Sequence, residues 1–68
     1  MTQTQKVLDY IDRFGSITPL QAIADLGIMR LAARISDLKK TGVEIHSETA
    51  KDLNRFGKPV HFTRYRRA

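Results

Sequence analysis

Residues 16–42, SITPLQAIADLGIMRLAARISDLKKTG, carry the helix start and stop signals that decide the fold. Thr18 precedes a proline and stands three positions before Gln21, which is the pattern of a capping box with proline at the first helical position. Gly27 is typical of a helix end, so this pattern predicts a short helix over residues 19–26. The apolar side chains expected to face its core side are Leu20, Ile23 and Leu26.

A further helix follows this glycine after only a few residues. Apolar residues recur every three or four positions, which predicts a helix over residues 29–41 that ends before Gly42. The expected buried side is formed by Ile28, Leu31, Ile35 and Leu38. The opposite side carries Arg30, Ala33, Arg34, Asp37 and Lys40.

An amphipathic segment precedes both helices and predicts a helix over residues 3–14. Thr2 or Thr4 can cap its start, and Gly15 supplies the residue that commonly ends a helix. Its apolar stripe is Val7, Leu8, Ile11 and Phe14.

The last third of the chain changes from helical to twofold periodicity, which indicates strands. Apolar and polar residues alternate over residues 43–48 and again over residues 59–65. The polar stretch 49–58 between them contains the turn residues Asn54 and Gly57. The two runs are therefore predicted to form a hairpin.

The apolar residues of the hairpin also suggest a strand register. Placing Ile45 opposite Phe62 keeps the apolar sets of both strands on one face. Tyr65 then has the wrong parity for that face, which predicts a bulge or a strand end near it. The same register places His61 opposite His46.

Positive charge is concentrated in one part of the chain. The 68 residues carry a net charge of +5. Residues 1–28 contain two basic and three acidic residues, whereas residues 29–68 contain ten basic and four acidic ones. This asymmetry favours a polyanionic partner, nucleic acid before a membrane surface.

Composition excludes several other classes. The absence of cysteine removes disulfides, thiol nucleophiles and cysteine-based zinc sites, and it suits the cytoplasm. No apolar run approaches the ~20 residues needed to span a bilayer, and the start MTQTQK has no apolar signal core. We therefore expect no membrane partner and no export.

The order of these elements defines the expected fold. It is α+β but mainly α, with a three-helix helix-turn-helix core followed by a two-stranded β-hairpin wing in one domain, residues 1–68. Residues 16–42 resemble the small winged helix-turn-helix proteins common in bacteriophages and prophages, and the hairpin agrees in layout. The resemblance implies sequence-specific binding of double-stranded DNA, to regulate transcription or recombination in the cytoplasm of a bacterial host. It implies no catalysis and no cofactor.

One departure from the common helix-turn-helix pattern concerns the third helix. Counted from Gly27, that pattern places buried apolar residues at Ala33 and Ser36, whereas the bulky residues here are Leu31, Ile35 and Leu38. The turn is then shorter than usual or the helix is rotated, and this decides which side chains face DNA.

The third helix is the expected recognition helix, because a helix fits the major groove of DNA. Arg30 and Arg34, one turn apart, can each pair with a guanine edge, and the small Ala33 allows close approach or contact with a thymine methyl. Asp37 can accept from cytosine or orient an arginine. The expected recognition residues are Met29, Arg30, Ala33, Arg34, Asp37 and Lys40.

The hairpin supplies further cations, which would fix position on the phosphate backbone and carry little sequence information. Those in the wing and tail are Lys51, Arg55, Lys58, Arg64, Arg66 and Arg67. Phe56 is unusual in a loop, and we expect it to fold back on Leu53 in a small cluster or else to mark a protein contact.

Enzymatic and metal-binding alternatives find little support in the sequence. Glu44, His46 and Glu48 share one strand face, but an exposed hairpin offers few convergent ligands, so we expect no metal site. No triad spacing and no glycine-rich phosphate loop occur, so neither an enzyme nor a small-molecule ligand is expected.

The main competing function is a winged-helix protein-interaction module, whose basic helix and wing dock on an acidic surface of a host protein. Structured RNA ranks lower because no platform of stacking aromatic residues is visible. One small module buries limited DNA surface, so specificity often needs a homodimer or a second protein at the site.

Overall fold

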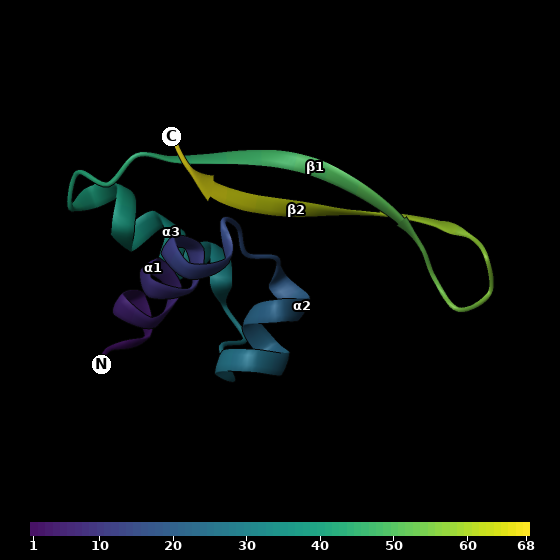
Figure 1. Cartoon of the computed structure of the whole chain (residues 1–68), viewed down its shortest axis with the longest axis horizontal. Helices are drawn as coiled ribbons and strands as arrows, with labels where there is room; N and C mark the ends of the chain where they lie inside the picture. The colour runs from purple at the N-terminus through teal and green to yellow at the C-terminus, as the bar shows by residue number, and fades with distance from the viewer.

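The computed structural model describes residues 1–68 and contains three helical segments followed by a β-hairpin (Figure 1). The elements in chain order are α1 (Gln3–Phe14), α2 (Pro19–Gln21) with its continuation η1 (Ala22–Leu26), α3 (Leu31–Lys40), β1 (Ile45–Leu53) and β2 (Pro59–Arg67). The helices form one body, and the hairpin lies across it and projects well beyond it (Figure 1).

The predicted helix caps are confirmed. The Thr18 hydroxyl accepts from the Gln21 backbone N–H at 3.2 Å, and the Gln21 side chain accepts from the Thr18 N–H at 3.0 Å. Thr2 and Gln5 make the same reciprocal pair at the start of α1. Gly15 ends α1 with φ of 88°, a conformation that favours glycine. These local hydrogen bonds fix where each helix begins and ends.

The inward face of the second helix differs from the prediction. Leu20 is 75% exposed and Ile23 is 44% exposed, so the expectation that they face the core was wrong. The fully buried residue is Ala22, and Leu26 is half-buried against the core. At about 100° per residue Leu20 lies roughly 160° from Ala22, so both cannot face inward. The small residue Ala22 occupies the position that faces the core, and the larger Leu20 faces solvent.

The third helix packs as the periodicity predicts. It begins at Leu31 and ends at Lys40, slightly inside the predicted bounds. Ala33 is half-buried and Ser36 is exposed, so the departure from the common helix-turn-helix pattern is real. The core is a single cluster of Val7, Tyr10, Ile11, Ile17, Ala22, Ile28, Leu31, Ile35, Leu38 and Ile45.

The hairpin has a different register from the predicted one. Both strands extend further than expected, and Ile45 pairs with Arg67 rather than with Phe62. Phe62 pairs instead with Ala50. The physical reason is the turn, because turn geometry sets hairpin register. The loop comprises only residues 54–58 rather than 49–58, closed by hydrogen bonds between Asn54 and Lys58.

This change of register reverses which residues of β2 face the core. The shift is five positions, an odd number, so Phe62 moves to the opposite face from Ile45. Tyr65 shares the face of Ile45 and packs on the core. Pairing continues through Tyr65 up to Arg67, so the bulge expected near it is absent.

Two tertiary contacts fasten the hairpin to the helices. Ile17, between α1 and α2, exchanges two backbone hydrogen bonds of 2.9 Å with Tyr65. Arg67 donates from Nη1 to Asp12 Oδ1 of α1 at 3.0 Å. The near half of the hairpin is therefore held against the body, while its far half extends from it (Figure 1).

Candidate nucleic-acid interface

The outer face of α3 is determined by the residues that the helix buries. Leu31, Ile35 and Leu38 are each 3% exposed. At about 100° per residue, Ser36 and Lys40 then lie on the side away from the core, and both are exposed. The expected recognition residues Arg30, Met29 and Lys40 are exposed, whereas Ala33, Arg34 and Asp37 are half-buried.

Arg34 is held by contacts within the protein. Its Nε lies 3.0 Å from Asp37 Oδ2, and its Nη1 donates to Gln3 Oε1 of α1 at 3.1 Å. Both contacts draw the guanidinium to the α1 side of α3. Arg30 has no ion-pair partner in the structure, so the two arginines expected to act together lie in different environments.

The other side of α3 forms one wall of a shallow groove, whose second wall is the hairpin. The groove has a volume of about 390 Å³. It is lined by Ala32, Ile35, Ser36 and Lys39 of α3 and by Ser47, Thr63 and Tyr65 of the hairpin. We call these seven residues the α3–wing groove.

Sequence reasoning missed the α3 side of this groove. Ala32, Ser36 and Lys39 were not among the predicted recognition residues, although all three are exposed. Their positions on the helix lie about 80–140° from Leu31, and a helical wheel centred on the buried residues would have found them. The sequence does not show on which side of the third helix the hairpin lies. It therefore could not favour the side with Ala32, Ser36 and Lys39 over the side with Arg30 and Arg34.

The two faces of the hairpin differ in charge. The face that contributes to the groove continues outward through Thr49 and Lys51 on β1 and through His61 on β2. The acidic residues of β1, Glu48 and Asp52, both lie on the opposite face. The groove side of the hairpin therefore contains cations and hydrogen-bonding side chains but no carboxylate.

Ion pairs separate the predicted wing and tail cations into two groups. Arg64 pairs with Glu48, its direct cross-strand partner, at 2.9 Å, and Arg67 pairs with Asp12 at 3.0 Å. Arg66 is unpaired but lies on the face opposite Lys51. The basic residues without an ion-pair partner are Lys6, Arg30, Lys39, Lys40, Lys51, Arg55, Lys58 and Arg66.

The tip of the hairpin does not form the expected apolar cluster. Phe56 is 80% exposed and Leu53 is 65% exposed, so the prediction that they bury one another was wrong. Asn54 and Gly57 are turn residues as predicted, with the Gly57 N–H donating to the Asn54 carbonyl at 2.9 Å. The tip thus presents an aromatic side chain to solvent.

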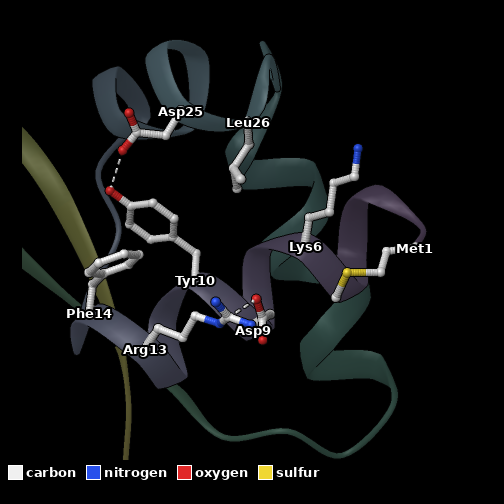
Figure 2. Close-up of a pocket in the computed structure, with 8 residues that line it drawn as sticks. All are labelled: Met1, Lys6, Asp9, Tyr10, Arg13, Phe14, Asp25 and Leu26. Carbon is white, nitrogen blue, oxygen red and sulfur yellow. Dashed lines mark hydrogen bonds and ion pairs between the residues drawn. The ribbon is translucent and has the colours of Figure 1, made fainter.

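A second hollow, of about 450 Å³, lies between α1 and η1 (Figure 2). The Tyr10 hydroxyl points to Asp25 and donates to its Oδ2 at 2.5 Å. This hydrogen bond raises the pKa of Tyr10, with smaller contributions from burial and from the charge of Asp25. Arg13 pairs with Asp9 along α1 at 3.0 Å, and the Phe14 ring lies 4.7 Å from that of Tyr10. The Tyr10–Asp25 hydrogen bond joins α1 to η1, whereas the other two contacts lie within α1.

The register also separates the two histidines. His46 pairs with Arg66 and His61 pairs with Lys51, so the predicted His46–His61 pairing was wrong. The structure contains no group of three or more histidine, aspartate or glutamate side chains that could hold a metal ion. No helix is long and apolar enough to cross a membrane.

Three helices with an exposed third helix, followed by an antiparallel hairpin beside it, define a winged helix. The winged helix-turn-helix domain family matches residues 2–66, and the chain belongs to that family. Comparison with curated proteins and with solved structures found no match to this chain. Domains of this family are typically nonenzymatic and bind DNA.

Proposed function

We propose that this protein binds double-stranded DNA sequence-specifically, with the exposed side of α3 in the major groove and the far half of the hairpin along the adjacent backbone. The observation that carries the proposal is the α3–wing groove, whose open sides bear unpaired cations and no carboxylate. Lys39 and Lys40 on α3 and Lys51 on the hairpin would bind phosphates.

The base-reading residues in this proposal lie on the exposed surface of α3. Ser36 can hydrogen-bond a base edge, and Ala32 and Ala33 are small enough to let the helix approach. Arg30, which is exposed and unpaired immediately before α3, would make a bidentate contact with guanine. Arg34 can join it only by leaving Asp37 and Gln3.

We further infer a regulatory role in transcription or recombination, as in the small phage and prophage proteins that residues 16–42 resemble. The module is small, so a second copy or a neighbouring protein on the same site would add to its specificity. The tail residues would not contact phosphate in this proposal, because Arg64 and Arg67 are already paired and Arg66 lies on the hairpin face opposite the groove.

The test is selection of duplexes from a random pool by the purified chain, followed by affinity measurement on the enriched and on a scrambled site. We expect enrichment of a defined sequence and at least 10³-fold tighter binding to it, the lower range for specific DNA-binding proteins. Salt-dependent binding without any enrichment would leave a nonspecific DNA binder. No binding at low salt by folded protein would contradict the proposal.

A second candidate function is docking on another protein. The observation that favours it is the exposed apolar pair Leu20 and Ile23 on α2 and η1, away from the α3–wing groove. Under this function, Leu20→Ser would remove the partner and leave DNA affinity unchanged. Isothermal titration with duplex and with the isolated partner would separate the two functions.

A further inference from the structure

The most exposed aromatic side chain of the protein lies at its furthest projection. Phe56, 80% exposed, is in the loop that joins β1 to β2, at the end of the hairpin remote from the helices (Figure 1). Leu53, 65% exposed, precedes the loop. Burial of an aromatic ring of this size against a partner is favourable, because it removes apolar surface from water.

The loop that carries Phe56 is ordered by its own hydrogen bonds. Asn54 Oδ1 accepts from the backbone N–H of Phe56 at 2.9 Å and from that of Lys58 at 3.1 Å. The Gly57 N–H closes the turn on the Asn54 carbonyl, so Arg55 and Phe56 occupy its two central positions. A preformed turn loses little conformational entropy when its apex binds.

The charges around Phe56 indicate a polyanion. Arg55 and Lys58 flank it in sequence, and neither has an ion-pair partner. The nearest acidic residue in the chain, Asp52, lies on the hairpin face opposite the groove, and its Oδ1 accepts from the Leu53 backbone. Unpaired cations also continue from the tip through Lys51 toward the α3–wing groove.

We propose that Phe56 is a wedge that enters the minor groove of duplex DNA, partly unstacks one base step and bends the duplex. Arg55 and Lys58 bind the phosphates on either side of that step. Apolar side chains that enter the minor groove act in this way and kink DNA by about 20–90°. The inference rests on the proposed DNA binding and adds a change of DNA shape to it.

The extent of the cationic surface distinguishes duplex DNA from a lipid membrane as the partner. Loop tips that enter a membrane also combine an aromatic ring with cations, but there the cations need only surround the tip. Here a further unpaired cation, Lys51, lies on the groove side of the hairpin between the tip and Lys39 on α3, and the acidic residues of β1 lie on the other side. A linear polyanion that runs past both the tip and α3 fits this arrangement.

The test measures DNA bending and base unstacking by the full chain and by three variants. A duplex of about 30 base pairs carries a dye at each end for energy transfer. A second duplex carries 2-aminopurine, whose fluorescence rises when its base unstacks. Phe56→Ala removes the wedge and Phe56→Leu keeps an apolar one. Phe14→Ala is the matched control, because Phe14 is a 69% exposed aromatic residue on α1 outside the groove.

We expect the natural chain, Phe56→Leu and Phe14→Ala to bend the duplex and raise 2-aminopurine fluorescence. Phe56→Ala should lose both signals and bind about tenfold more weakly, with its salt dependence unchanged, because a base stacked on an aromatic ring contributes roughly this much. Equal bending by Phe56→Ala, or binding of the natural chain without bending, would overturn the wedge and leave the proposed function standing.

A third arm uses vesicles of phosphatidylcholine and phosphatidylserine. Phe56-dependent binding to these vesicles, with no bending of duplex DNA, would assign the tip to a membrane and overturn the inference. Failure of the natural chain to bind any duplex at low salt would overturn both the inference and the proposed function.

Discussion

Lys51 and Arg66 provide a matched test of which hairpin face binds DNA. Both are exposed cations without an ion-pair partner on the same two-stranded wing. The register puts Lys51 on the face that continues from the α3–wing groove and Arg66 on the opposite face. Only Lys51→Ala should therefore weaken DNA binding, although each substitution removes one positive charge.

The magnitude follows from counterion release. Each phosphate contact contributes about 0.9 to the slope of log affinity against log salt concentration. Between about 50 and 200 mM salt, a fourfold change, one such contact accounts for about a 3.5-fold loss of affinity. Lys51→Ala should reduce the slope by about 0.9. Between about 50 and 200 mM salt, its affinity should therefore fall about 3.5-fold less than that of the natural chain. Arg66→Ala should keep the natural slope.

The assay is fluorescence anisotropy of a labelled duplex, titrated with each variant at four salt concentrations. Circular dichroism provides the control, because both substitutions are at the surface and should change the free energy of unfolding by less than ~0.5 kcal/mol. Equal loss of slope in the two variants would refute the assignment of faces. A loss in Arg66→Ala alone would mean that DNA lies on the other side of the hairpin.

Four other predictions concern stability, pH, sequence preference and metal. Ile28→Val, at a residue 1% exposed between η1 and α3, should lower the free energy of unfolding by about 0.5–1.5 kcal/mol in urea titration; no change would mean that this turn is loosely packed. The pKa of Tyr10 is raised in the folded state, so the contribution of this residue to stability is complete below its unfolded pKa and is lost as pH rises through the higher folded value. Thermal melts should therefore show a steeper loss of stability at alkaline pH for the natural chain than for Tyr10→Phe, and parallel curves would refute this. Arg30→Ala should weaken binding to the selected site by about 1–3 kcal/mol and binding to random duplex by less, whereas Arg34→Ala should change the sequence preference less. Equal loss on all sequences would mean that Arg30 contacts only the DNA backbone. Chelators should change neither the melting temperature nor DNA affinity, and stabilisation by stoichiometric zinc would contradict this.

The helical half of the fold could be predicted from sequence because its signals are local. The Thr18–Gln21 capping box involves residues three positions apart, and both of its hydrogen bonds form. The buried stripe of α3 likewise follows from a repeat within ten residues. The inward face of the second helix could not be predicted by size, because the buried position is held by Ala22 while Leu20 is exposed. Its choice depends on what packs against the helix.

The hairpin register could not be predicted because apolar alternation fits more than one pairing. The pairing of Ile45 with Phe62 would put all bulky residues on one face, but the turn centred on Arg55 and Phe56 sets another register. Burial of Tyr65 through its backbone bonds to Ile17 is a contact across 48 positions, which no local pattern contains.

The two elements that form the candidate site could be predicted from the sequence, but the arrangement of their side chains could not. The sequence identified α3 and the wing, and it allowed Asp37 to orient Arg34, yet it could not show that Arg64 and Arg67 have partners within the protein. These last two ion pairs join different elements, so they depend on the tertiary structure. The groove between α3 and the hairpin likewise depends on how these two elements pack in the tertiary structure.

The central claim is that duplex DNA occupies the α3–wing groove, and amide chemical-shift mapping of the ¹⁵N-labelled chain tests it most directly. On addition of duplex, we expect the largest shifts at Ala32, Ser36 and Lys39 of α3 and at Ser47 and Thr63 of the hairpin. Little change is expected around the Tyr10–Asp25 hollow between α1 and η1. Shifts concentrated at that hollow, or no shifts at low salt, would contradict it.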